Sequence, residues 1–235
     1  MEIKLTKKPQ NPTLIEGFPG FGLIGTITTE FLIEHLKAEK IGSFYYDDLP
    51  ATVAIHNEKL VDPMGVFYDK KYNLVILHTI LNATGLEWKL AKEITKMCKD
   101  LKVKEIISLE GVSSPSVTES KKVFFFTNKD KNKAKLKKLG MEPLKESIIV
   151  GVSGALMLRS KTPLTCLFAE TRTDILDSKA AANIIKSLDE YLKLKVDFKP
   201  LLKQAEDFEG KFKNILKQTS VTQREADKKQ MSYFG

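Results

Sequence analysis

Short apolar runs of strand length alternate along the chain with segments in which apolar residues recur every three or four positions. Residues 74–77 (LVIL) and 106–109 (IISL) are almost continuously apolar, as strands covered on both faces require. The remaining short runs are bounded by turn-forming residues and also predict strands. The predicted strands are 3–5, 13–15, 41–46, 52–55, 66–68, 74–80, 105–109, 123–127, 148–152 and 164–169. The predicted helices are 23–36, 86–101, 134–139 and 179–192.

This alternation of strands and helices predicts an α/β fold, a three-layer sandwich with a mixed central sheet. The shorter strands within residues 41–68 indicate an antiparallel excursion inside that sheet. We expect an α/β core domain over residues 1–195.

The chain changes character after the core. Residues 196–218 predict a C-terminal amphipathic helix, because apolar residues recur there at alternating steps of four and three. The seam is too short for a stable isolated coiled coil, so it must pack on the body or on another subunit. Residues 219–235 predict a flexible tail that is polar until its last five residues, MSYFG.

Charge and hydropathy exclude several function classes. No apolar run reaches the roughly 18 residues that span a bilayer, and the first residues predict a strand instead of a signal peptide, so we expect a cytoplasmic protein without a membrane partner. The net charge of +8 rests on lysine, since the only arginines are Arg159, Arg172 and Arg224. The densest basic run, 129–138, has no interleaved aromatic residues and predicts a solvated helix face. A nucleic-acid partner is therefore not expected.

Cysteine and histidine are too few and too scattered to indicate a metal site. Cys98 and Cys166 each continue an apolar pattern, which is typical of reduced core residues. His35, His56 and His78 lack the spacing of metal ligands. We predict no metal and no other cofactor.

The run EGFPGFGLIG at residues 16–25 follows an apolar strand and opens a helical pattern. Gly20, Gly22 and Gly25 match the G-x-G-x-x-G spacing of dinucleotide-binding folds, where glycines let backbone N–H groups approach a pyrophosphate. Asp47 and Asp48 stand roughly where the ribose-binding carboxylate is expected, about 20 residues further on. A nucleotide- or nucleoside-binding enzyme that uses this turn is therefore one interpretation.

The bulky residues of the same run favour a different interpretation. Phe18 and Phe21 place large side chains in the turn, and Pro19 removes a backbone N–H from it. The favoured interpretation is a tight strand-to-helix turn whose glycines allow close packing and positive φ. The glycines concerned are Gly17, Gly20, Gly22 and Gly25.

Three carboxylates, Glu16, Glu110 and Glu170, each fall at the end of a predicted strand, the edge where open α/β sheets bind ligands. They could form an acidic crevice, but we favour a role in accepting hydrogen bonds from loop N–H groups. The sequence around Ser153 comes close to a G-x-S-x-G nucleophile elbow, yet Ala155 replaces the second glycine and every histidine precedes the serine. No catalytic set emerges, and we predict that the protein is not an enzyme.

Four segments in order, EGFPGFGLIG (16–25), LEG (109–111), GVSGALML (151–158) and LFAET (167–171), resemble the archaeal branch of the proteasome assembly chaperone 2 family. The match covers most of residues 10–210. The resemblance implies a phosphorylase/hydrolase-like fold, similar to that of purine nucleoside phosphorylases but used for binding instead of catalysis. It also implies a homo-oligomer that contacts proteasome α-subunits and helps to assemble the 20S core particle.

The resemblance further implies a role for the last three residues, Tyr233, Phe234 and Gly235. Some members of the family end in a hydrophobic–tyrosine–any tripeptide that inserts between neighbouring α-subunits, and here Phe234 stands where tyrosine is expected. The missing phenolic hydroxyl removes one hydrogen bond, a loss of roughly 0.5–1.5 kcal/mol. Two alternatives stay open: a weakened docking peptide, or a protein that acts without tail docking through another partner.

Overall fold

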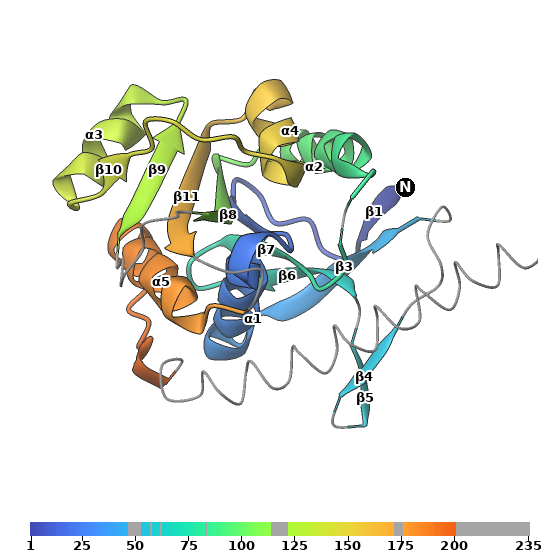
Figure 1. Ribbon diagram of the computed structural model, residues 1–235. Coiled ribbons are helices and arrows are strands. Elements are labelled where there is room, and N and C mark those ends of the chain that lie inside the picture. Colours follow the sequence, from blue (N-terminus) through green and yellow to red (C-terminus); the bar gives the residue numbers. More distant parts are fainter. Residues whose placement is uncertain are drawn as a thin grey trace, which may run out of the picture.

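A mixed sheet forms the middle layer of the protein in the computed structural model (Figure 1). The structure describes residues 1–46, 53–56, 58–61, 63–82, 84–113, 122–171 and 176–200. Within these residues the sheet has nine strands in the spatial order β1-β3-β6-β7-β2-β8-β11-β9-β10. Their bounds are β1 Glu2–Leu5, β2 Thr13–Gly17, β3 Glu39–Tyr45, β6 Met64–Asp69, β7 Leu74–Thr79, β8 Glu105–Ser113, β9 Val123–Thr127, β10 Glu142–Pro143 and β11 Leu164–Thr171. A separate hairpin consists of β4 (Ala54–His56) and β5 (Lys59–Val61).

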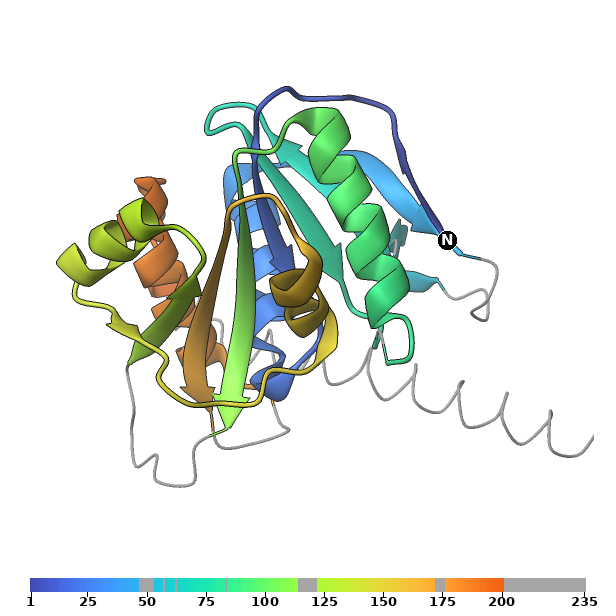
Figure 2. The ribbon, with the colours of Figure 1, turned by 90° about the horizontal axis from the view of Figure 1, so that it is seen from above.

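Helices cover both faces of the sheet and complete the three layers. Their bounds are α1 Ile24–Leu36, α2 Glu87–Leu101, α3 Asp130–Lys138, α4 Gly151–Arg159 and α5 Ser178–Leu192. Helices α1 and α5 pack together over one face, and α2 and α4 pack together over the other (Figures 1 and 2). A short 3-10 turn, Phe21–Leu23, joins β2 to α1.

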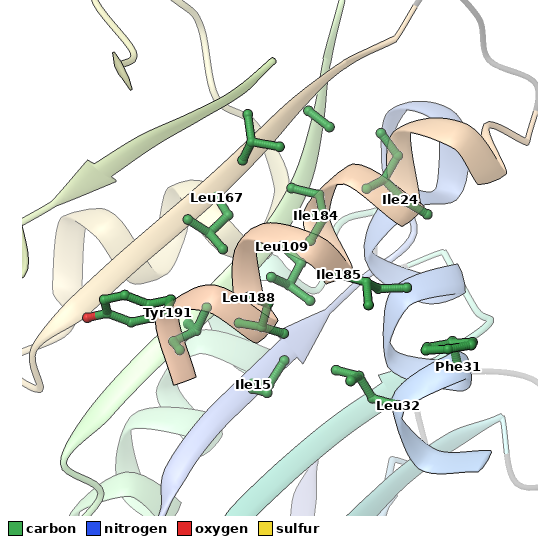
Figure 3. Close-up of a cluster of buried hydrophobic side chains, with 14 of the residues drawn as sticks. Ile15, Ile24, Phe31, Leu32, Leu109, Leu167, Ile184, Ile185, Leu188 and Tyr191 are labelled. Atoms are coloured by element: carbon green, nitrogen blue, oxygen red, sulfur yellow. The ribbon is translucent and has the colours of Figure 1, made fainter. Parts of the chain in front are cut away.

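The apolar spacing of the helices explains how the layers hold together. Side chains of α1 and α5 point toward β2, β8 and β11 and form one of two buried clusters (Figure 3). Ile184, Ile185 and Leu188 of α5 are at most 1% exposed, and their spacing of one, three and four residues places them on one helix face. The second cluster, under α2 and α4, contains Leu90, Ile94 and other buried residues of α2. Burial on both faces explains why the central strands are almost continuously apolar.

The central strands β7, β2, β8 and β11 are parallel, whereas β6, β3 and β1 follow one another in antiparallel pairs beside β7. The chain leaves β2 through α1 toward this antiparallel side and returns in β7. Helix α2 then carries it past β2 to β8, on the opposite side. The strand order therefore reverses at β2, and the carboxyl ends of β2 and β8 flank the crevice where α/β folds usually bind ligands.

The predicted α/β three-layer fold with a mixed sheet is confirmed, as is the antiparallel excursion before β7. The strand predicted at 148–152 is wrong. Residues 147–150 are irregular, Ile148 and Val150 are exposed, and α4 begins at Gly151 with φ +86°. Two apolar side chains that face outward mimic a buried strand in the sequence, because apolar content alone does not show which way a segment turns.

The C-terminal region stays a prediction. Residues 201–218 of the expected helix and all of the expected tail, 219–235, lie outside the described residues, as do Tyr233, Phe234 and Gly235. At the described end of the chain, the backbone N–H of Lys199 donates to Asp197 Oδ1 at 3.0 Å. In the described part of the protein, no helix is both long enough and apolar enough to span a bilayer.

Candidate functional site

Polar side chains from three adjacent parallel strands lie next to one another inside the apolar layer beneath α4. Ser108 of β8 is paired in register with Glu16 of β2 on one side and with Cys166 of β11 on the other. Alternation along the strands turns these side chains, and that of Glu110 two residues further along β8, toward the α2 and α4 layer. Glu16, Ser108 and Cys166 are fully buried, and Glu110 is 9% exposed.

Ser153 of α4 connects this cluster to the helix above it. Its Oγ lies 2.6 Å from Glu110 Oε1 and 3.2 Å from Glu16 Oε1. The Ser108 hydroxyl donates to Ser153 Oγ at 2.7 Å. The helix presents Ser153 inward because its buried positions, Val152, Ser153, Ala155 and Leu156, follow helical spacing.

The geometry favours one shared proton within the carboxyl pair. A serine hydroxyl has one proton, so Ser153 can donate to only one of Glu16 and Glu110. Both contacts are satisfied when the other carboxyl is protonated and donates to Ser153 Oγ. The arrangement is therefore complete when the pair carries about one proton.

The pKa values agree with this arrangement. Burial raises the pKa of Glu16 to about 7, against the opposing effect of its serine hydrogen bonds. Burial, followed by the nearby charge of Glu16, raises the pKa of Glu110 to about 8. Two coupled carboxyls titrate as one unit, so we treat the pair as holding about one proton near neutral pH. Burial also raises the pKa of the Cys166 thiol, which keeps it protonated and unreactive.

A cavity of about 780 Å³ opens beside the carboxyl pair, at the carboxyl ends of β2 and β8. Its walls come from the turn after β2, the end of β8, the segment after β7 and the irregular segment before α4. Phe18, Phe21 and Ile149 contribute apolar surface, and Glu110 and Glu87 contribute carboxyls. No lysine, arginine or histidine occurs among the described residues that line it.

The glycine-rich turn packs directly on β8. An added Cβ on Gly25 would lie 2.5 Å from the main-chain oxygen of Leu109, and one on Gly17 would lie 2.2 Å from that of Gly25. Gly22 has φ +67°, which favours glycine. These positions require glycine for the backbone alone, without any ligand.

Gly20 faces the carboxyl pair. An added Cβ there would lie 2.5 Å from Glu110 Oε2. A carboxyl group therefore stands where a dinucleotide-binding turn would hold phosphate, and this counts against the nucleotide-binding interpretation. Asp47 and Asp48, the candidate ribose ligands, lie outside the described residues.

The other candidate residues lie apart from this cluster. Glu170 is half-buried and pairs in register with Val112, two residues beyond Glu110 along β8. His78 is buried, with Nε2 3.1 Å from Glu30 Oε2, and His35 stacks on Phe31. The described residues contain no group of three or more His, Cys, Asp or Glu side chains that could hold a metal ion.

Sequence reasoning missed the part that Ser108 and Ser153 play. Ser108 is a polar residue in an otherwise apolar strand, and this pattern indicates a buried hydroxyl that needs a hydrogen-bond partner. The sequence around Ser153 comes close to a nucleophile elbow, but the residue lies within the first turn of α4. Only the packing of α4 on the sheet, which involves residues far apart in the chain, brings it to the carboxyl pair.

The chain is similar in sequence and in fold to several known proteins. The model of the PAC2 family matches residues 14–216. The crystal structure of Pyrococcus furiosus PbaA, an archaeal homolog of proteasome-assembly chaperone, superposes with a TM-score of 0.84 and 28% identity, covering 94% of this chain and 99% of that one. P. furiosus PbaB, an archaeal proteasome activator, shares the fold at a TM-score of 0.74 and 23% identity, over 91% of this chain and 97% of that one. An uncharacterized protein of Methanocaldococcus jannaschii is 27% identical over 212 residues, which is 89% of this chain and 87% of the relative.

Proposed function

This chain belongs to the PAC2 family, as the resemblance predicted, and from that premise we propose that it is a non-enzymatic chaperone that assists assembly of the 20S proteasome by binding α-subunits. The similarity to PbaA carries the proposal, because it extends over 94% of the chain at a TM-score of 0.84. A likeness of that extent spans nearly the whole chain. We further propose that the protein works in the cytosol as a homo-oligomer.

The chemistry of the buried cluster supports a binding protein over a hydrolase. A serine nucleophile needs an adjacent base that accepts its proton and then releases it to the leaving group. Ser153 contacts two carboxyls and Ser108, but its hydroxyl is fully buried, so a substrate cannot reach it. The hydroxyl is thus used as a link between α4 and the sheet.

The C-terminal residues Tyr233, Phe234 and Gly235 are the proposed docking peptide. A terminal carboxylate can pair with a lysine in a pocket, while the neighbouring aromatic ring fills an apolar groove. A single tripeptide binds weakly, and Phe234 lacks the phenolic hydroxyl. Several tails on one oligomer would raise the overall affinity through effective concentration.

In the proposed organisation, one part of the chain forms the oligomer and another part docks on the α-subunit. The α/β core (1–195) would form the oligomer, and the helix over 196–218 would hold the tail (219–235) away from it. The tail can then reach an α-subunit without rearrangement of the core. The core sheet would therefore fold equally well when the last three residues are removed.

Native mass spectrometry of the full-length protein mixed with α-subunits or α-rings tests the proposal. We expect a complex with the full chain and its loss in a variant that lacks residues 233–235. A matched variant, Tyr233→Ala with Phe234→Ala, keeps the chain length and the terminal carboxylate and separates the rings from the charge. Equal binding by all three proteins would move the interface to the folded core, and absence of binding by the full chain would contradict the proposed function.

A further inference from the structure

The cavity beside Glu110 differs in charge from the rest of the protein. The chain contains 38 lysine and arginine residues and has a net charge of +8. The described residues that line the cavity nevertheless include two glutamates, Glu87 and Glu110, and no basic side chain. A cavity of this kind repels phosphates and carboxylates and attracts cations.

The Glu110 carboxyl connects the buried cluster with the cavity, and it also accepts a hydrogen bond from the backbone N–H of Gly111. Oε1 accepts a hydrogen bond from Ser153 at 2.6 Å. Oε2 lies beside Gly20, where an added Cβ would approach it to 2.5 Å, so the carboxyl occupies the space that a side chain at Gly20 would need. Glu110 is nine-tenths buried and forms part of the cavity wall.

The carboxyl pair also has hydrogen-bonding capacity that the described protein leaves unused. Glu16 Oε2 is buried and has no hydrogen-bond partner among the described residues. A buried oxygen without a partner is unfavourable, and its negative charge is only weakly screened. This oxygen belongs to the carboxyl pair that adjoins the cavity through Glu110.

The remaining walls of the cavity suit an apolar body. Phe18 and Phe21 from the turn after β2 and Ile149 from the segment before α4 face the same space. Aromatic faces attract cations and also pack on flat apolar groups. A volume of about 780 Å³ is in the range of small-molecule sites.

We propose that this cavity is a binding site for a small organic cation, an amidinium, guanidinium or ammonium ion with an apolar body, and that the Glu110 carboxylate is its anionic partner. The site is separate from the proposed docking peptide and does not depend on it.

Binding at this site must be linked to protons. The titratable groups around Glu110 are Glu16 from β2, Cys166 from β11 and Glu87 from α2 across the cavity. Burial keeps the Cys166 thiol protonated by raising its pKa, whereas the pKa values of Glu16 and Glu110 are about 7 and about 8. A bound cation favours the ionised form of Glu110, so binding releases a proton when Glu110 is protonated beforehand. Affinity should therefore increase as the pH rises toward about 8, the pKa of Glu110.

Benzamidine and benzamide are a matched pair of probes. Both have the same ring and nearly the same shape, but only benzamidine is a cation, and it keeps its charge across this pH range. Titration calorimetry with the full-length protein should show saturable binding of benzamidine, at least about tenfold tighter than that of benzamide. The observed binding enthalpy should also vary with the ionisation enthalpy of the buffer, which shows that binding releases a proton. Equal affinity for the two probes, or no saturable binding of benzamidine, would overturn the proposal.

Two variants of the carboxyl pair separate a binding role from a structural one. Glu110→Gln removes the anionic partner and should weaken benzamidine binding at least about tenfold. Glu16→Gln removes the like charge that raises the pKa of Glu110, so it should strengthen benzamidine binding between about pH 7 and pH 8, where Glu16 is ionised in the wild type and Glu110 still retains protons. Glu170→Gln, at a carboxylate outside the cavity wall, is the control and should leave affinity unchanged. A general structural disturbance would move both pair variants in the same direction, and that result would contradict the proposal.

Discussion

The Ser153 hydroxyl of α4 and the Glu110 carboxyl of β8 lie 2.6 Å apart, although 43 residues separate them in the chain. This contact belongs to a small cluster of polar side chains inside a largely apolar layer. It fixes the first turn of α4 on the sheet, and with it the segment before α4 that forms one wall of the cavity.

Replacement of Ser153 by alanine should destabilise the protein by about 1–3 kcal/mol, because two buried carboxyls lose their shared hydrogen-bond partner. Urea unfolding followed by circular dichroism measures the change. Ser160→Ala, at the other end of α4, is the control. Ser160 donates only to the carbonyl of Thr162 and is half-buried, so its loss should be smaller. Equal effects of the two substitutions would contradict a special role for Ser153.

The free energy of unfolding should decrease as the pH rises from about 5 to about 8. The pKa values of Glu16 and Glu110 are raised in the folded protein to about 7 and about 8, above their ordinary value of 4.5. Between these limits the folded protein keeps protons that the unfolded chain has lost, so its stabilisation is complete below the unfolded pKa and is lost as the pH passes the folded values. Each carboxyl can contribute up to about 1.4 kcal/mol per pH unit.

Denaturant titrations at several pH values test this dependence. Glu16→Gln and Glu110→Gln each remove one titrating carboxyl and should reduce the slope of stability against pH. Glu142→Gln, at an exposed carboxylate of β10, should leave the slope unchanged. A slope that is the same in the wild type and in both pair variants would show that the buried carboxyls do not retain protons.

Gly25→Ala should destabilise the protein by about 3 kcal/mol, because the added Cβ would lie 2.5 Å from a main-chain oxygen of β8 that has little freedom to move. Gly140→Ala is the matched control. That residue has φ +81° but open space around it. Its replacement should therefore lower the free energy of unfolding only by the backbone strain of about 1–2 kcal/mol. Thermal and urea unfolding without any ligand measure both. A stable Gly25→Ala protein would show that this glycine is required for something other than packing.

The sequence predicts the sheet well because burial on both faces leaves a direct pattern in strands such as 74–77 and 106–109. It also places Glu16 and Glu110 near one edge of the sheet, although β8 continues to Ser113, three residues beyond Glu110. It does not predict that Glu170 stays outside the cluster, since that depends on the register of β11 against β8, which pairs Glu170 with Val112. The contact between Ser153 and the carboxyl pair depends on how α4 packs on the sheet, and no local sequence pattern predicts that contact.

Restoring the expected hydroxyl in the tail should strengthen binding to the proteasome. Phe234→Tyr adds one hydrogen bond to the proposed docking peptide, worth roughly 0.5–1.5 kcal/mol, or about 2- to 12-fold in affinity per tail. Phe234→Leu removes the ring but keeps an apolar side chain and should weaken binding. Surface plasmon resonance on immobilised 20S particles measures the series. Identical affinities for the wild type and both variants would exclude Phe234 from the interface.

The rate at which 20S particles form from separately purified α- and β-subunits tests the proposed chaperone function most directly. With the full-length protein present, we expect faster appearance of 20S particles on native gels and a transient complex that contains α-subunits. The variant without residues 233–235 should lose most of this effect, whereas Glu170→Gln should retain it. An unchanged assembly rate, with no complex between the full-length protein and α-subunits, would contradict a role in proteasome assembly.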